Sequence, residues 1–375
     1  MEMTFDLEKV ETPADRNRFI RLPWNIYRDH PCWVPPLIGE RKRFLDPKIN
    51  PFFEEAETDL YLVLDENRTP VGRIAITLNH AYNKFHSERV GFFGLFESVD
   101  DRKVSDLLLD KAYAWCHEKN LDKLMGPANL STNHECGLLV EGFDTPPVIG
   151  IPYNLPYYVD LFQQWGLNKA KDLLSLKLDL TGIPAYLESG ISRLRKRNRF
   201  SVRPFRPNKF DEEIDIMWDV YNSAWTANWG FVPMSQREFV FSAHEMKSFV
   251  HPEFCLIAEV KGEPAGFSLT LPDVNQILKH MDGRLFPLGW AKFLWGRNKI
   301  NNYRVVALGV KNKFRRLGID AYFNYTTYQK FLAEKVPVCD LSWVLEDNHN
   351  ILDPIRRIGG TIYKRHRIYE RACIS

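Results

Sequence analysis

The order of strand-like and helix-like segments constrains this 375-residue chain most, because the same order occurs twice. In each half, a strand and helical stretches lead to a β-hairpin, which is followed by strand, helix, strand and helix. The hairpins are predicted over Asp59–Leu64 with Val71–Leu78, and over Phe254–Val260 with Ala265–Leu271. A repeated order of elements indicates two copies of one folding unit.

Each hairpin is followed by a strand–helix–strand crossing. In the second half, the strands Arg304–Val310 and Val338–Leu345 enclose a helix with Ile319 and Phe323 on one face. Such crossings imply parallel pairing, whereas hairpins are antiparallel. We therefore predict an α/β (α+β) chain of two tandem domains, residues 1–180 and 181–375, each a twisted mixed sheet flanked by helices.

Bulk composition excludes several classes of protein. The net charge of +2 gives no overall attraction to nucleic acid. No apolar run approaches the roughly 18 residues of a membrane span, and the N-terminus lacks the apolar core of a signal peptide. The 6 cysteines form no CxxC pair. We therefore expect reduced thiols, no bound metal and a cytoplasmic location.

The most specific motif runs from Val310 to Asp320, between a predicted strand and a predicted helix. Unpaired N–H groups at a helix N-terminus attract anions, and the helix dipole adds to this attraction. Gly318 allows the backbone to approach a ligand closely, and Arg315 and Arg316 add positive charge. The motif predicts a diphosphate site, and an ordinary basic helix start is the alternative.

This stretch resembles the pyrophosphate motif of the GNAT superfamily of acyltransferases, in which Arg or Gln precedes Gly-x-Gly/Ala by two residues. Arg315 and Gly318 match, whereas Asp320 stands where a small residue is usual. The resemblance implies acyl-CoA as the acyl donor, without a metal. It implies these donor-binding residues: Val310, Arg315, Arg316, Leu317, Gly318, Ile319 and Asn348.

The segment from Asn348 to Gly360 resembles a later GNAT element, in which a strand ends in Asn and a helix runs to Gly-Phe. The family's general-acid tyrosine corresponds to Ile355 here. The segment from Asn154 to Leu167 is similar to the same element in the first half. However, Val99–Val104 lacks Arg-x-x-Gly and is acidic, so we predict that the first domain kept the fold and lost CoA binding.

Transfer to an amine requires a proton acceptor near the thioester. Glu346, Asp347 and His349 follow the predicted strand Val338–Leu345. Glu346 is our preferred base and His349 the second catalytic candidate, and capping of the next helix is the alternative.

A second polar cluster covers Asn129–Gly137. Its His-x-Cys pattern lacks the Pro-Cys-x-x-Cys partner of zinc deaminases, so we reject metal and cysteine catalysis. Glu135 is a further catalytic candidate and Asn133 a substrate contact, with a purely structural loop as the alternative. Tyr157 and Tyr158 are also predicted substrate contacts, with core packing as the alternative.

Two surface segments have several interpretations. The basic run Arg193–Arg199 fits a solvated helix face, a nucleic-acid surface or a site for anionic lipid headgroups, and it accompanies no known nucleic-acid motif. Leu285–Arg297 fits an interfacial helix, the lining of a long-acyl channel or an extra core helix. We expect peripheral contact with an anionic inner membrane rather than with nucleic acid.

The whole chain resembles a tandem GNAT branch that includes bacterial ceramide synthases. The similar residues are Gly126–Asn129, Gly137–Phe143, Asp282–Pro287 and Tyr363–Tyr369. The resemblance implies transfer of a long acyl chain to a lipid-like primary amine such as a sphingoid base. Alternatives are tRNA-dependent aminoacyl transfer of the peptidoglycan-bridge type and a non-catalytic ligand sensor, and an acyl-carrier protein could replace CoA.

Overall fold

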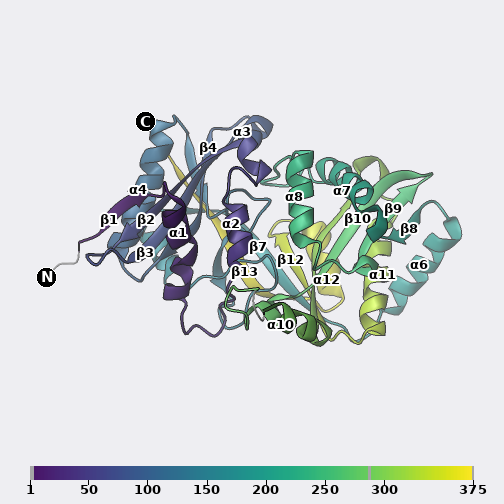
Figure 1. Ribbon diagram of the computed structural model, residues 1–375. Coiled ribbons are helices and arrows are strands. Elements are labelled where there is room, and N and C mark those ends of the chain that lie inside the picture. The colour runs from purple at the N-terminus through teal and green to yellow at the C-terminus, as the bar shows by residue number, and fades with distance from the viewer. Residues whose placement is uncertain (1–3, 286–288, 374–375) are drawn as a thin grey trace. The chain divides into compact units, whose positions relative to one another are not determined.

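The computed structural model describes residues 4–285 and 289–373 (Figure 1). The chain forms two compact units. Unit 1 contains the residues up to Leu173, the segment Ile277–Leu294 and the chain from Lys364 onward, and unit 2 contains Leu174–Gln276 and Trp295–Tyr363. Two strands have residues in both units, β7 (Asn168–Asp179) and β13 (Thr361–Ala372).

Unit 1 is built on a mixed sheet. Five of its strands lie side by side in chain order: β1 (Asp6–Lys9), β2 (Ala56–Leu64), β3 (Pro70–Asn79), β4 (Val90–Ser98) and β5 (Lys123–Gly126). Strand β13 lies next to β5. The neighbours pair antiparallel except β4 and β5, which are parallel. The short strand β6 (Leu138–Glu141) pairs with β13.

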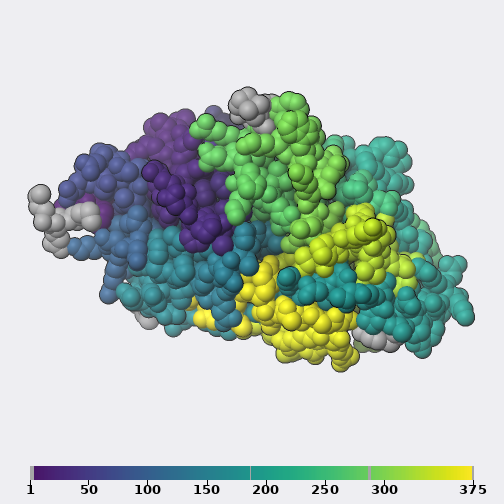
Figure 2. Space-filling model, turned by 90° about the horizontal axis from the view of Figure 1, so that it is seen from below, coloured from purple at the N-terminus to yellow at the C-terminus, as the bar shows by residue number. Residues whose placement is uncertain are grey.

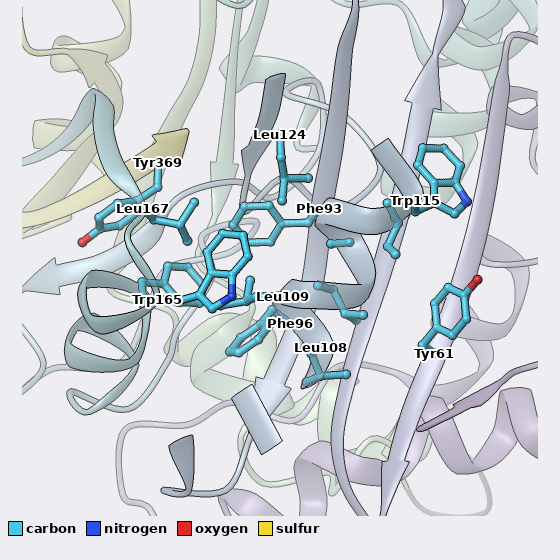
Figure 3. Packing of buried hydrophobic residues seen from close by; sticks show 14 of the residues in the cluster. Tyr61, Phe93, Phe96, Leu108, Leu109, Trp115, Leu124, Trp165, Leu167 and Tyr369 are labelled. Carbon is cyan, nitrogen blue, oxygen red and sulfur yellow. The ribbon is translucent and has the colours of Figure 1, made fainter. Parts of the chain in front are cut away.

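Helices cover both faces of this sheet because its strands alternate apolar side chains between the two faces. On one face, α1 (Pro13–Ile26) buries Phe19 and Ile20 against the sheet, and α2 (Ile38–Phe44) contributes Ile38 and Phe44 to the same cluster. On the other face, α4 (Arg102–Glu118) and α5 (Tyr158–Trp165) contribute Leu108, Trp115 and Trp165 to a buried cluster that also contains Phe93 and Phe96 (Figure 3). A short helix, α3 (His80–His86), links β3 to β4.

Unit 2 repeats this plan. Its strands after β7 lie in the order β12 (Val338–Leu345), β11 (Asn302–Val310), β10 (Glu263–Pro272), β9 (Cys255–Val260) and β8 (Ser201–Pro204). The pair β11–β12 is parallel, and β8 to β11 pair antiparallel. The helices of unit 2 are α6 (Ala185–Arg197), α7 (Phe210–Ala224), α8 (Gln236–Met246), α11 (Ile319–Ala333) and α12 (His349–Arg357). Two further helices, α9 (Asn275–Leu278) and α10 (Gly289–Gly296), have residues in both units.

The predicted fold class is confirmed, because both units have a mixed sheet with helices and one parallel strand–helix–strand crossing. In unit 2, α11 packs Ile319 and Phe323 against strand residues such as Leu256 and Val310. Within the described residues, no helix has both the length and the apolar character that crossing a bilayer requires.

Candidate active site

The parallel strands of unit 2 separate before they end. Pairing between β11 and β12 is last at Val305 with Leu341, although β11 continues to Val310 and β12 to Leu345. A bulge in the β10–β11 ladder, between Leu269 and Thr270, lies at the same level. Bulges bend strands, so β11 turns away from β12 and leaves an opening between them.

The hydrogen bonds between β10 and β11 show which main-chain groups of β11 face this opening. The N–H of Lys311 donates to the carbonyl of Ala265 at 2.9 Å, which places the Lys311 amide on the β10 side. Because successive residues of a strand alternate direction, the N–H and C=O groups of Leu308 and Val310 point toward the opening. An extended ligand can bond to this edge as an added strand would.

The turn after β11 contains main-chain N–H groups that the described part of the protein itself does not bond. Arg316 and Gly318 have φ values of 72° and 84°, and Gly318 is the N-cap of α11 without a capping side chain. In the part of the chain that the structure describes, the N–H groups of Arg316, Gly318, Ile319 and Asp320 have no hydrogen-bond partner. The N–H groups of Arg315 and Leu317 make long bonds of 3.3 and 3.4 Å within the turn. Unpaired amides at a helix start are groups that can bind an anion.

The C-terminal end of α7 holds this turn in place. The guanidinium of Arg315 donates to the carbonyl of Ala224 at 2.8 Å, and Lys311 pairs with Asp219. The ring of Trp225 lies against Gly309, where an added Cβ would be 2.1 Å from it. Arg315 thus braces the loop, and Arg316 is the exposed cation beside the free amides.

Unit 1 contains the corresponding strand edge, but its own residues occupy it. Pairing of β4 with β5 ends at Phe92 with Met125. Beyond that point, the N–H of Ala128 donates to the carbonyl of Phe93, and the N–H of Leu95 donates to Oδ1 of Asn129, both at 2.7 Å. The polar loop Asn129–Gly137 therefore begins by filling the space between the strands.

Ser98 of unit 1 corresponds to Val310 of unit 2. In both units the next residue donates its N–H to the adjacent strand, Val99 to Val71 and Lys311 to Ala265. The N–H of Ser98 donates to the hydroxyl of Tyr158 at 3.0 Å, and its carbonyl accepts from Tyr157 at 2.6 Å. Burial raises the pKa of both tyrosines, so they remain protonated. These contacts satisfy the edge that is open in unit 2.

The helix starts of the two units also differ. In unit 1 the carboxylate of Asp101 caps α4 and accepts from the N–H of Lys103 at 2.8 Å. Asp100 precedes it, so the helix start is acidic and already capped. A phosphate would meet like charge there. In unit 2 the N-cap is Gly318, so no side chain caps α11, although the first turn of the helix contains the carboxylate of Asp320.

The predicted site residues of the polar loop bond to unit 1 itself. Glu135 pairs with Arg41 at 2.7 Å and accepts from the Asn129 side chain at 3.1 Å. Burial raises the pKa of Glu135, but Arg41, Asn129 and His134 lower it further, and the net result is below its usual value. The N–H of Asn133 donates to the hydroxyl of Ser131. These bonds favour the structural alternative for the loop.

His134 lies between aromatic rings. Its imidazole packs edge-on against Phe44 and Phe52, and Nδ1 lies 3.2 Å from the hydroxyl of Ser131. Burial lowers the pKa of His134 to about 4. Among residues 4–285 and 289–373, no group of three or more His, Cys, Asp and Glu side chains could hold a metal ion.

The predicted catalytic residues of unit 2 lie at the open end of β12. Glu346 is half-buried in the turn that directly follows the strand, Asn348 is the N-cap of α12, and His349 is exposed at its first residue. Ile355 packs beside Gly360, where an added Cβ would be 2.3 Å from it. The position of the family's tyrosine thus carries no hydroxyl.

A buried polar cluster at the closed end of the opening was missed from the sequence. Asp340 accepts from the hydroxyl of Tyr363 at 2.6 Å and from Ser342, and it lies opposite Arg304 in the ladder. Nε of Arg304 donates to the carbonyl of Ser342 at 3.1 Å. Burial and Asp340 raise the pKa of Tyr363. The signal was the alternation of Asp340 with Ser342, but the strand that carries Tyr363 was not predicted.

Comparison with known proteins gives the family. No family model matches the chain. The chain is 34% identical over 367 residues to Protein YghO of Escherichia coli, covering 95% of this chain and 93% of that protein. It is 35% identical over 372 residues to the bacterial ceramide synthase of Caulobacter vibrioides, covering 97% and 96%.

A solved structure shows the same fold over the whole length. This tandem GNAT protein from the clavulanic acid biosynthesis pathway has a TM-score of 0.57 and 11% identity, and the match covers 100% of this chain and 99% of that one. Together with the two relatives, this match confirms the predicted family. The chain belongs to the tandem GNAT-fold N-acyltransferases.

Proposed function

We propose that this N-acyltransferase takes its acyl group from acyl-CoA bound at the opening and turn of unit 2. The observation that carries the proposal is the set of N–H groups at Arg316, Gly318 and Ile319 that have no hydrogen-bond partner within the described residues, next to the unpaired strand edge. The turn would hold the diphosphate, and Leu308 and Val310 would bond the pantetheine arm. Unit 1, which contains most of the predicted first domain (residues 1–180), would bind no donor of its own.

One relative and a group of aromatic side chains in unit 2 support a lipid-like acceptor and a long acyl chain. A relationship of 35% identity to a bacterial ceramide synthase supports a sphingoid-base-like amine and a long acyl chain. Trp225, which packs on Gly309, belongs to an aromatic group with ring centroids 5.3–5.7 Å apart. Its other members are Tyr221, Phe239 and Phe267. Such a wall suits an alkyl chain.

The residues at the opening would carry the chemistry. The amide of Leu308 would donate to the thioester oxygen as negative charge develops there. Glu346 would accept a proton from the attacking amine, with His349 as the second candidate. A carbon–nitrogen bond forms, the carbon–sulfur bond breaks, and the leaving sulfur takes up a proton.

We also propose that α10 contacts an anionic membrane. Trp290, Leu294 and Trp295 are 48%, 49% and 79% exposed, and the segment lies at the surface (Figure 2, green). The chain from Gly283 to Ile319 has no Asp or Glu. Exposed tryptophans beside Lys292 and Arg297 suit a lipid interface. The predicted residues Phe286–Leu288 lie outside the described part of the chain.

The test is acyl transfer by the full chain with CoA thioesters from acetyl to palmitoyl, measured as thiol release. Acceptors are sphinganine and a short amino alcohol of the same head structure. We expect kcat/KM to rise with acyl length and to be highest with sphinganine. Equal rates with the short amine, or a preference for acetyl-CoA, would remove the lipid assignment and leave the transferase.

A further inference from the structure

We propose that helix α6 binds the 3′-phosphate of coenzyme A and makes the donor site selective for CoA over thioesters that lack this phosphate. The inference rests on the proposed donor site, and it gives the basic run of α6 a specific role. Three observations support it: the position of α6, the charge that it carries and the chemistry of the donor.

The last turns of α6 lie against the start of α11, within unit 2. An added Cβ at Gly318 would be 2.8 Å from Cδ1 of Leu194, so Leu194 contacts the diphosphate turn. The guanidinium of Arg195 lies 5.7 and 5.6 Å from the ring centroids of Tyr322 and Tyr325, in the next turns of α11. The basic run is therefore adjacent to the proposed diphosphate site.

The charge on this helix is strongly one-sided. From Ile191 to Lys209 the chain has no Asp or Glu. Lys196 and Arg197 are exposed and, among the described residues, make no ion pair or hydrogen bond through their side chains. Other cations near the turn are neutralised, since Lys311 pairs with Asp219 and Lys313 with Glu263. The α6 cations thus supply uncompensated positive potential beside the turn.

The phosphate groups of coenzyme A are complementary to this positive charge. Coenzyme A carries a diphosphate and a separate phosphate on the ribose 3′-oxygen. The amides of α11 and Arg316 account for the diphosphate, but a further dianion needs its own cations. Lys196 and Arg197 can provide them from the adjacent helix. Phosphopantetheine on a carrier protein has no ribose phosphate, so these residues would favour CoA.

Calorimetric titration of the full chain tests this without an acceptor. The ligands are CoA and 3′-dephospho-CoA, which differ only in the phosphate at issue. We expect wild type to bind CoA about tenfold more tightly, the effect of one or two charge-assisted bonds. The variant Lys196→Gln/Arg197→Gln should bind the two ligands within about twofold of each other. The control Lys261→Gln/Lys335→Gln removes two exposed charges elsewhere in unit 2 and should keep the wild-type ratio.

The outcomes separate this inference from the proposed function. Equal wild-type affinity for the two ligands would overturn the role of α6 and leave the donor site intact. If neither ligand binds, the donor site itself is overturned. If the double variant keeps its preference for CoA but loses binding of an acidic acyl-carrier protein, then α6 docks a protein and our inference is wrong. Thermal unfolding of each variant checks that the fold is retained.

Discussion

At the scale of single residues, Glu346 is the side chain on which the proposed chemistry depends most. It follows β12 directly, at the open end of the strand pair, and is half-buried. We predict that Glu346→Gln lowers kcat about 100-fold with little change in KM for the thioester, because it removes a base but no donor contact. Steady-state kinetics measure this, with exposed Glu334→Gln as the control. If the variant raises only the KM and keeps kcat, Glu346 contributes to binding instead.

His134 makes a prediction about stability. Burial lowers its pKa from 6.5 to about 4, so the unfolded chain binds the proton more readily than the folded chain. The stabilisation is complete above about pH 6.5 and is lost as the pH falls toward 4. We expect this group to account for up to about 3 kcal/mol of that loss.

Urea unfolding at several pH values measures the His134 effect. The variant His134→Asn is expected to be less stable at pH 7.5, since it loses ring packing, but to lose less stability on acidification than wild type. An unchanged pH dependence in the variant would show that other groups control acid unfolding.

At the scale of elements, the two parallel strand pairs have the same design with opposite outcomes. In unit 1, Tyr157 and Tyr158 bond to Ser98, while the same edge of unit 2 is open at Val310. Tyr158 also donates to the buried carboxylate of Glu97 at 2.8 Å. The tyrosines thus explain physically why we propose one donor site rather than two.

The variant Tyr158→Phe tests this explanation. It leaves the Ser98 amide without this partner and removes one donor from Glu97, so unfolding free energy should fall by about 1–3 kcal/mol. The affinity for CoA should not change, because unit 1 binds no donor in our account. Chemical denaturation and CoA titration of the same preparation measure both effects. Weaker CoA binding in a folded variant would place Tyr158 in the donor site.

Some strands could be predicted from the sequence and others could not. Hairpin and crossing strands such as Val338–Leu345 were predicted correctly, because their apolar patterns are dense and bounded by turns. By contrast, β7 and β13 were missed, since charged residues such as Lys171 and Arg367 interrupt their apolar positions. Ion pairs explain this: Asp172 is buried and bonds to Arg367 at 2.7 Å. A buried pair between distant segments has no local signature in the sequence.

The candidate site could be predicted only where it depends on a local sequence motif. The turn with Gly318 has a local motif, and its N–H groups lack partners within the described residues. The closure of unit 1 was predictable only from the acidic Asp100–Asp101 segment. The roles of Asn129 and Tyr157 depend on main-chain partners more than 30 residues away, at Leu95 and Ser98. No spacing rule reveals such contacts.

At the scale of the whole molecule, the membrane proposal predicts binding to anionic vesicles. We expect the full chain to co-sediment with phosphatidylglycerol vesicles and to dissociate at high salt, because part of the attraction is electrostatic. Trp290→Ala/Trp295→Ala should lower the bound fraction several-fold. Exposed Phe85→Ala, distant in sequence, is the control. Equal binding to neutral phosphatidylcholine vesicles would argue against the cationic contribution.

The central claim is that the chain has one donor site, at the α11 turn of unit 2. Calorimetric titration of the full chain with CoA, for wild type and Gly318→Ala, tests it most directly. A side chain at Gly318 meets both its φ of 84° and Leu194. We predict a stoichiometry of one and at least tenfold weaker binding in the variant. A stoichiometry of two, or unchanged affinity in Gly318→Ala, would contradict the account.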